Sequence, residues 1–121
     1  MRFSDENEVV GAQVRTFLLE RSRVTSTSKA NERSYHVLYF LVAGKTEFAP
    51  EPTESYKYLS LSGCTTVPDM DDNAEFTILQ NALLSVGIAP SELDQCWAFV
   101  ASMLYLGNLD FGKGDKAAIT D

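Results

Sequence analysis

The sequence predicts an α+β fold that is mostly α-helical, in which a short N-terminal β-hairpin precedes about three buried helices. Residues 8–19 alternate between two faces with a period of two, which is typical of a strand. Apolar residues beyond position 31 recur instead at helical spacing. The length of 121 residues suits a single domain, and contents of 45% apolar and 11% aromatic residues exclude a disordered chain.

The hairpin is predicted within residues 1–24. Met1–Phe3 is the remnant of a first strand, Ser4–Asn7 is the turn, and Glu8–Leu19 is the second strand. Because a two-stranded hairpin alone is marginal in water, this second strand needs further partners. The hydroxyl-rich stretch Val24–Ala30 is predicted to be a loop.

The first helix is predicted to follow this loop. Asn31 can cap a helix over about 32–43, and Gly44 stands just beyond its end. Its apolar residues cover nearly all of its faces, which indicates a buried helix. The proline-containing stretch 45–55 is then a loop, and residues 56–59 form a short aromatic element.

Two longer helices complete the predicted elements. Asp72 and Glu75 have the spacing of a capping box and open the second helix, which ends near Gly87. Pro90 is well placed as the first residue of the third helix, which stops at Asn108. This last helix is predicted to be buried on two sides, because it has two apolar stripes: Leu93, Trp97, Val100 and Leu104, and Cys96, Phe99, Met103 and Leu106.

The charge of the chain excludes several classes of protein. The net charge is −7, and the acidic excess lies after residue 33, whereas a nucleic-acid-binding domain usually presents a basic patch. We therefore expect no nucleic-acid partner. A solvated or ion-paired segment is the simplest interpretation of the only basic cluster, which comprises Arg15, Arg21, Arg23, Lys29 and Arg33.

The sequence has no recognisable targeting signal, and its two cysteines do not indicate a particular compartment. No apolar run approaches the ~18 residues of a membrane span, so no such span is expected. Acidic residues occupy the place of a signal peptide's apolar region. Cys64 and Cys96 have no companions at zinc-binding spacing, and we expect reduced thiols in a cytoplasmic protein.

No constellation of residues indicates catalysis, a cofactor or a metal. Residues 44–46, Gly-Lys-Thr, are similar to the end of a phosphate-binding loop, but the full motif needs a glycine where Tyr39 stands. His36, the only histidine, lacks a nucleophile and an orienting partner, so we interpret it as structural. Helix capping explains the acidic residues before the second helix, which are Asp69, Asp71 and Asp72.

Five strings of the sequence share one resemblance. Residues 11–24 are G-A-Q-V-R-T-F-L-L-E-R-S-R-V, residues 31–39 are N-E-R-S-Y-H-V-L-Y, residues 56–64 are Y-K-Y-L-S-L-S-G-C, Asp71-Asp72 precedes Phe76, and residues 101–111 are A-S-M-L-Y-L-G-N-L-D-F. In this order and spacing they resemble the myosin motor domain. Its patterns are G-A-x-I-x-T-Y-L-L-E-K-S-R-V, G-E-R-N-Y-H-I-F-Y, Y-x-Y-L-x-x-S-G-C, D-D-x-x-x-F and A-A-I-L-H-L-G-N-I-x-F. The resemblance covers nearly the whole chain.

Two positions depart from the family's pattern, and one further likeness is set aside. Tyr105 replaces the usual histidine, and Ala89 stands where the family often has a serine cap. Met1–Phe3 is similar to the end of switch I, but the count back from Gly11 places Phe3 on the following strand. The role of the switch I arginine is therefore not assigned to Arg2.

The resemblance implies an internal fragment of a P-loop NTPase head, in the upper 50 kDa region after switch I. Residues 1–24 would supply a hairpin with one strand of the transducer sheet, 31–111 a helical portion, and 112–121 a flexible tail. In the family this sheet links the nucleotide site to the actin-binding cleft. The implied partners are the remainder of the head and F-actin, and the implied location is cytoplasmic and cytoskeleton-associated.

The resemblance also bounds what this chain can catalyse. These 121 residues contain no P-loop, switch I or switch II, so we expect no ATP hydrolysis by the chain alone. ATP and Mg²⁺ are implied only for the full-length family member. If the resemblance holds, charged residues at the point where the predicted strand leaves the transducer sheet couple the twist of the sheet to the position of the next helix. The candidates for this coupling are Glu20, Arg21, Arg23 and Arg33.

Two hypotheses for the function remain open on the sequence. The first is a fragment of an actin-based motor ATPase that contributes the coupling region between nucleotide site and actin cleft. The second is a free-standing acidic helical module, derived from a myosin, with a binding or structural role. The reading frame upstream of Met1 would distinguish the two hypotheses, because only the first requires an in-frame P-loop and switch I.

Overall fold

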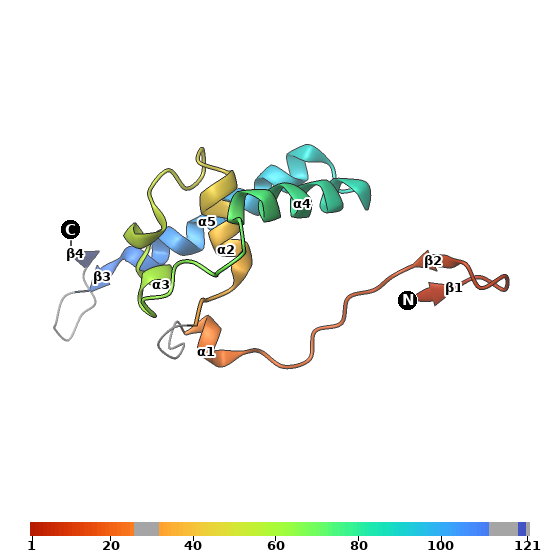
Figure 1. Cartoon of the computed structure of the whole chain (residues 1–121), viewed down its shortest axis with the longest axis horizontal. Coiled ribbons are helices and arrows are strands. Elements are labelled where there is room, and N and C mark those ends of the chain that lie inside the picture. The colour runs from red at the N-terminus through yellow and green to blue at the C-terminus, as the bar shows by residue number, and fades with distance from the viewer. Residues whose placement is uncertain (26–31, 112–118, 121) are drawn as a thin grey trace.

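A computed structural model describes residues 1–25, 32–111 and 119–120 of the chain (Figure 1). The helical part contains two long helices and several short ones, and each end of the described chain carries a small antiparallel strand pair. In chain order the elements are β1 (Arg2–Phe3), β2 (Val9–Gly11), α1 (Arg21–Val24), α2 (His36–Gly44), the 3₁₀ helix η1 (Thr53–Ser55), α3 (Lys57–Ser60), α4 (Asp72–Ser85), α5 (Pro90–Asn108), β3 (Asp110–Phe111) and β4 (Ile119–Thr120).

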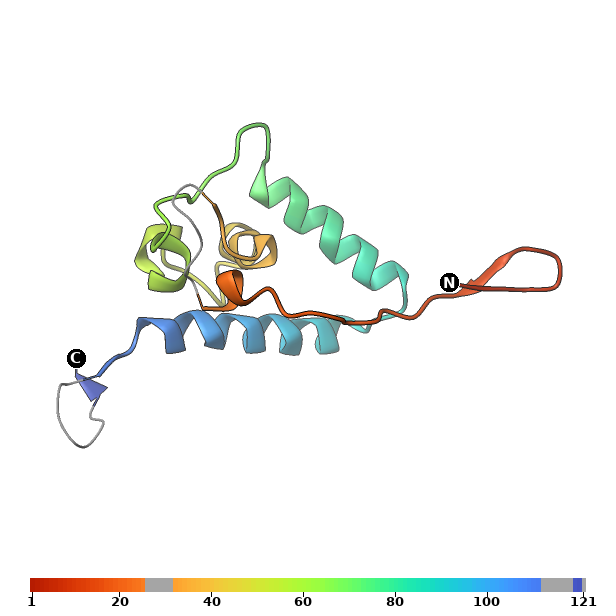
Figure 2. The same cartoon turned by 90° about the horizontal axis from the view of Figure 1, so that it is seen from below.

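The N-terminal hairpin is present, but the predicted strand over Glu8–Leu19 is wrong in its extent. β2 pairs with β1 through Arg2–Gly11 and Phe3–Val9, and the strand ends there. Residues 12–20 run on without regular structure, and both views show this arm leading away from the helices (Figures 1 and 2). A strand needs a hydrogen-bonded neighbour, and β1 is only two residues long.

Helix α2 begins four residues later than the sequence predicts. Residues 32–35 are not helical, Tyr35 is the N-cap without a side-chain cap bond, and the predicted cap Asn31 lies outside the described residues. Gly44 is the last helical residue. A Cβ at Gly44 would lie 2.1 Å from Cδ1 of Phe76, so only glycine allows α4 to approach α2 this closely.

Helix α4 begins as predicted, but its cap is a different residue. The carboxylate of Asp71, not Asp72, accepts hydrogen bonds from the backbone N–H groups of Asn73 and Ala74, at 3.0 and 3.2 Å. The capping box predicted from Asp72 and Glu75 is therefore wrong. Asp71 satisfies the first backbone donors, which leaves the Asp72 carboxylate available to another part of the molecule.

Helix α5 has the predicted bounds and half of a capping box. Ala89, its N-cap, has no acceptor in its side chain, but the carboxylate of Glu92 accepts from the Ala89 N–H at 3.0 Å. At the other end, Asn108 accepts from the Lys57 N–H at 2.8 Å and donates to the Ser55 carbonyl at 2.9 Å. The end of α5 therefore holds η1 and the start of α3 in place.

The core lies where α2, α4 and α5 meet, with α3 against one end of α5 (Figure 2). Only one face of α5 is buried, so the prediction of burial on two sides is wrong: Phe99 is 69% and Leu106 64% exposed. Helix α4 buries only Phe76 fully. The buried apolar residues are Leu38, Tyr39, Leu41, Val42, Ala49, Tyr56, Leu59, Phe76, Leu93, Trp97, Ala101 and Leu104.

Tyr105, one of the departures from the family pattern, has a defined place at the edge of this core. Its hydroxyl donates to the Phe48 carbonyl at 3.2 Å, and its ring packs edge-on against Tyr56 with centroids 5.8 Å apart. Burial, assisted by the neighbouring Tyr105 hydroxyl, raises the pKa of Tyr56 to about 12.

No helix within the described residues is long and apolar enough to cross a membrane.

Candidate functional site

The short helix α1, at the end of the N-terminal arm, is fixed by Arg23. The Arg23 Nε lies 2.8 Å from a carboxylate oxygen of Glu20, one turn earlier. The same guanidinium donates through Nη1 to the backbone carbonyls of Arg33 and Ser34, at 3.3 and 3.2 Å. The hydrogen bond to Glu20 is the largest cause that raises the pKa of Arg23. Arg23 thus joins the arm to the segment that leads into α2.

Two hydroxyl groups hold the other side of α1. The Ser34 hydroxyl donates to the Arg23 carbonyl at 3.3 Å. The Tyr58 hydroxyl, from α3, lies 2.6 Å from the Arg23 carbonyl and 2.9 Å from the Val24 carbonyl. The last carbonyls of a helix have no partner within it, so these bonds satisfy groups that would otherwise need water. Backbone and side-chain bonds together therefore tie α1 to the segment before α2 and to α3.

The side chain of Arg33 points to a different partner. Its Nη1 and Nη2 nitrogens form a bidentate pair with the two carboxylate oxygens of Asp72, at 3.1 and 2.7 Å. The guanidinium carbon lies 3.8 Å from the centroid of the Tyr39 ring, and the Arg33 side chain is only 2% exposed. A planar guanidinium matches a carboxylate in this way and also stacks on an aromatic face. The pair joins the segment before α2 to the first residue of α4.

Tyr39 completes the cluster from within α2. Its hydroxyl accepts a hydrogen bond from the Ser34 N–H at 3.2 Å and donates one to the Leu59 carbonyl at 3.1 Å. Since Tyr39 is 1% exposed, both bonds are buried and of fixed geometry. We call Arg23, Arg33, Ser34, Tyr39, Tyr58 and Asp72 the junction cluster.

Three of the four predicted coupling residues meet in this region. Glu20 contacts Arg23, and Arg23 contacts the backbone of Arg33. Arg21 stays apart: its side chain is exposed, and its carbonyl serves only the local turn by accepting from Thr25. The sequence did not reveal the other members of the cluster, which are Ser34, Tyr39, Tyr58 and Asp72. The only signal for Asp72 was the adjacent Asp71, because one cap leaves the second carboxylate free.

His36 and Lys45, which the sequence offered as candidates for catalysis and for phosphate binding, pack against neighbouring side chains. His36 packs edge-on against Phe40, with ring centroids 6.1 Å apart. Lys45 forms ion pairs with Glu47 at 2.9 Å and Asp94 at 3.0 Å, and hydrogen bonds to these carboxylates raise its pKa. Among the described residues, no group of three or more His, Cys, Asp or Glu side chains could hold a metal ion.

Comparisons with known proteins agree along the whole chain. The family described as Myosin head (motor domain) matches residues 1–121. Over the full length of this chain, it is 37% identical to Myosin-1 of Emericella nidulans and 36% identical to the Myosin-K heavy chain of Dictyostelium discoideum. It is 39% identical to Myosin-16 of Arabidopsis thaliana over 97% of its length. The chain spans only 10%, 15% and 10% of these three relatives.

Proposed function

This chain belongs to the myosin head (motor domain) family, and we propose that it serves as a coupling segment of an actin-based motor ATPase. In this proposal it lies in the upper 50 kDa region of a P-loop NTPase head. The N-terminal arm contributes to the transducer sheet, between the nucleotide site and the actin-binding cleft. ATP and Mg²⁺ are bound by parts of the head outside these residues, and F-actin is the partner of the complete, cytoskeleton-associated motor.

One observation supports the coupling role most directly. The extended arm ends at α1, and α1 is bonded to the entry of α2 through Arg23 and to α3 through Tyr58. Arg33, whose carbonyl accepts one of the Arg23 bonds, holds the start of α4 through Asp72. A continuous set of polar contacts therefore runs from the arm to three helices.

The proposed mechanism is a stiff joint. A net hydrogen bond contributes about 0.5–1.5 kcal/mol, so displacing the arm without the helices would cost several such bonds at once. Moving α1, the entry of α2 and α3 together preserves them. A shift of the sheet would then reach the outer helices as a displacement of whole elements, which is how packed interfaces transmit motion.

The test is the substitution Arg23→Ala in a complete head that contains this segment. We expect basal ATPase activity to stay near its original value and actin activation to fall severalfold. Arg21→Ala is the matched control, because Arg21 is on the same turn of α1 with an exposed side chain. Unchanged actin activation in the Arg23→Ala head would refute the coupling role, and an equal loss in both variants would assign it to charge alone.

The alternative function is a free-standing acidic helical module with a binding or structural role. The helical part favours it in one respect, because it has its own core of buried residues around Tyr39, Trp97 and Leu104. The two functions differ in what the gene encodes before Met1. An in-frame P-loop and switch I would support the motor, whereas an immediate stop codon and promoter would support the module.

A further inference from the structure

Met70 lies in the loop before α4, with its thioether against the buried guanidinium of Arg33. The Met70 sulfur is 3.7 Å from Nη1 of Arg33. A turn positions Met70 there: Asp69 has a left-handed φ of 63°, and the Met70 N–H donates to the Val67 carbonyl at 3.3 Å. The next residue, Asp71, is the N-cap of α4. The backbone on both sides of Met70 therefore holds it beside the guanidinium.

The Arg33 guanidinium has more donors than good acceptors. Its bidentate pair with Asp72 uses one N–H of Nη1 and one of Nη2. Nη1 also contacts the Met70 sulfur, but a thioether is a weak acceptor. Within the described part of the chain, the buried Nε–H of Arg33 has no acceptor. Because a buried donor without a good partner costs free energy, a stronger acceptor at this place would stabilise the fold.

Oxidation of Met70 would supply such an acceptor. Its side chain is partly exposed, so a small peroxide can reach the sulfur. The O–O bond of the peroxide breaks and one oxygen bonds to the sulfur, so the methionine is oxidised to its sulfoxide while hydrogen peroxide is reduced to water. An N–H···O bond spans about 2.9 Å. Since the sulfur is 3.7 Å from Nη1, an oxygen attached to it can accept the second N–H of Nη1 while the first stays on Asp72.

We propose that Met70 is an oxidative modification site, at which a peroxide adds one oxygen that tightens the contact between Arg33 and the start of α4. This direction is opposite to the usual one, because oxidation of a packed methionine ordinarily disrupts its surroundings. The consequence for a motor rests on the coupling role proposed above. A tighter junction cluster would transmit a displacement of the arm to α4 more completely.

The first experiment compares the full chain with Met70→Leu, a volume-conserving change, before and after dilute hydrogen peroxide. Dithiothreitol then reverses disulfides and sulfenic acids formed at the free thiols of Cys64 and Cys96, whereas a methionine sulfoxide persists. Peptide mass spectrometry locates the added oxygen. Urea unfolding followed by the fluorescence of Trp97 measures the stability.

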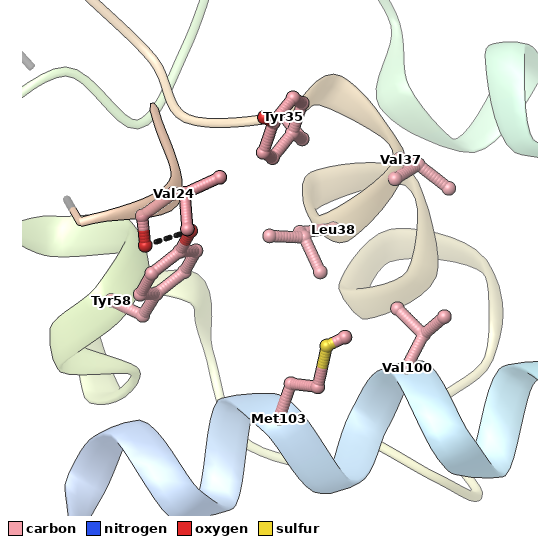
Figure 3. A pocket seen from close by; sticks show the side chains of 7 residues that line it. All are labelled: Val24, Tyr35, Val37, Leu38, Tyr58, Val100 and Met103. Atoms are coloured by element: carbon pink, nitrogen blue, oxygen red, sulfur yellow. Dashed lines mark hydrogen bonds between the residues drawn. The ribbon is translucent and has the colours of Figure 1, made fainter. Parts of the chain in front are cut away.

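Met103 provides the matched control, because it is 45% exposed and therefore open to the same oxidant. Its side chain extends from α5 toward Leu38, an apolar neighbour with no donor for a sulfoxide oxygen (Figure 3). The control variant is Met103→Leu. A further variant, Met70→Gln, places an amide oxygen near the expected position of the sulfoxide oxygen and needs no oxidant.

We expect a sulfoxide at Met70 and a fall of about tenfold in the equilibrium constant for unfolding, because a hydrogen bond to a charged group contributes about that much. The fall should appear in Met103→Leu as well, be absent in Met70→Leu and be reversed by methionine sulfoxide reductases. Met70→Gln should be more stable than Met70→Leu. The proposal would be wrong if oxidation destabilised the chain, if Met70→Leu gained as much, or if no oxygen were found at Met70.

A complete head that contains this segment tests the consequence for the motor. Met70→Gln and Met70→Leu are compared there without peroxide, so that only this position differs. We expect higher actin activation with glutamine than with leucine. Equal activation would refute regulation through Met70. The coupling role itself is tested separately by Arg23→Ala, so failure of the one can be told from failure of the other.

Discussion

The N-terminal arm and the helical part are both rich in apolar residues, yet they bury them in opposite ways. Leu41 in α2 is 0% exposed, whereas Leu18 in the arm is 97% exposed. A helix satisfies its backbone hydrogen bonds internally and needs only a surface to pack on. An extended segment needs a neighbouring strand for its backbone as well as a surface for its side chains. Among the residues that the structure describes, the helical part therefore has its packing partners and the arm does not.

The largest effect that would test this comparison is expected from removing the partner of a buried charge in the helical part. Asp72→Ala leaves the Arg33 guanidinium buried and unpaired, which costs about 3–5 kcal/mol. Asp71→Ala, its control, removes only a helix cap and should cost about 1 kcal/mol. Urea unfolding followed by the fluorescence of Trp97, the only tryptophan, measures both. Equal costs would contradict the assignment of the two aspartates.

A second, smaller effect concerns the contact between α2 and α4. Gly44→Ala would place a methyl group within 2.1 Å of the Phe76 ring, and Phe76 is only 5% exposed, so it has little room to move. Overpacking of this kind costs about 1–3 kcal/mol. Gly11→Ala in β2 is the control, since nothing lies within 4 Å of its added carbon. The two are compared by urea unfolding, and a neutral Gly44→Ala would show that the two helices separate easily.

The smallest effect on stability is expected in the arm itself. Leu18→Ser should change the free energy of unfolding by less than about 0.5 kcal/mol, because the side chain makes no buried contact to lose. It should instead raise the solubility of the isolated chain, since exposed apolar strands promote aggregation. Light scattering and urea unfolding measure these two quantities. A loss of several kcal/mol would mean that the arm packs on the helices in solution.

The elements that depend on local chemistry could be predicted from the sequence. Pro90 at the start of α5 and the acidic start of α4 are set by groups within one turn of the chain. The partners of the Asn108 side chain at the end of α5, Lys57 and Ser55, lie far away in the sequence. The choice between Asp71 and Asp72 as the cap could not be predicted. Either carboxylate suits a cap, and the decision depends on Arg33, which lies 39 residues away in the sequence.

The candidate site was only partly predictable for the same reason. Charge density where the arm ends pointed to Glu20, Arg21, Arg23 and Arg33, and three of these take part in contacts at the junction cluster. The sequence could not show that Arg33 uses its backbone toward Arg23 and its side chain toward Asp72. Nor could it show that Tyr58 would reach the end of α1 from α3.

The sequence by itself determined the family of the chain, the order of its longer helices and the residues at which the last of them begins and ends. These follow from ordered motifs and from periodicities that act over a few residues. Only the tertiary structure decided how far β2 extends, which face of α5 is buried and where the buried charge of Arg33 is paired. Each of these depends on a partner distant in the sequence: a neighbouring strand, a packed helix or an opposite charge. Local sequence specifies the group that needs a partner, and the fold determines whether the partner is there.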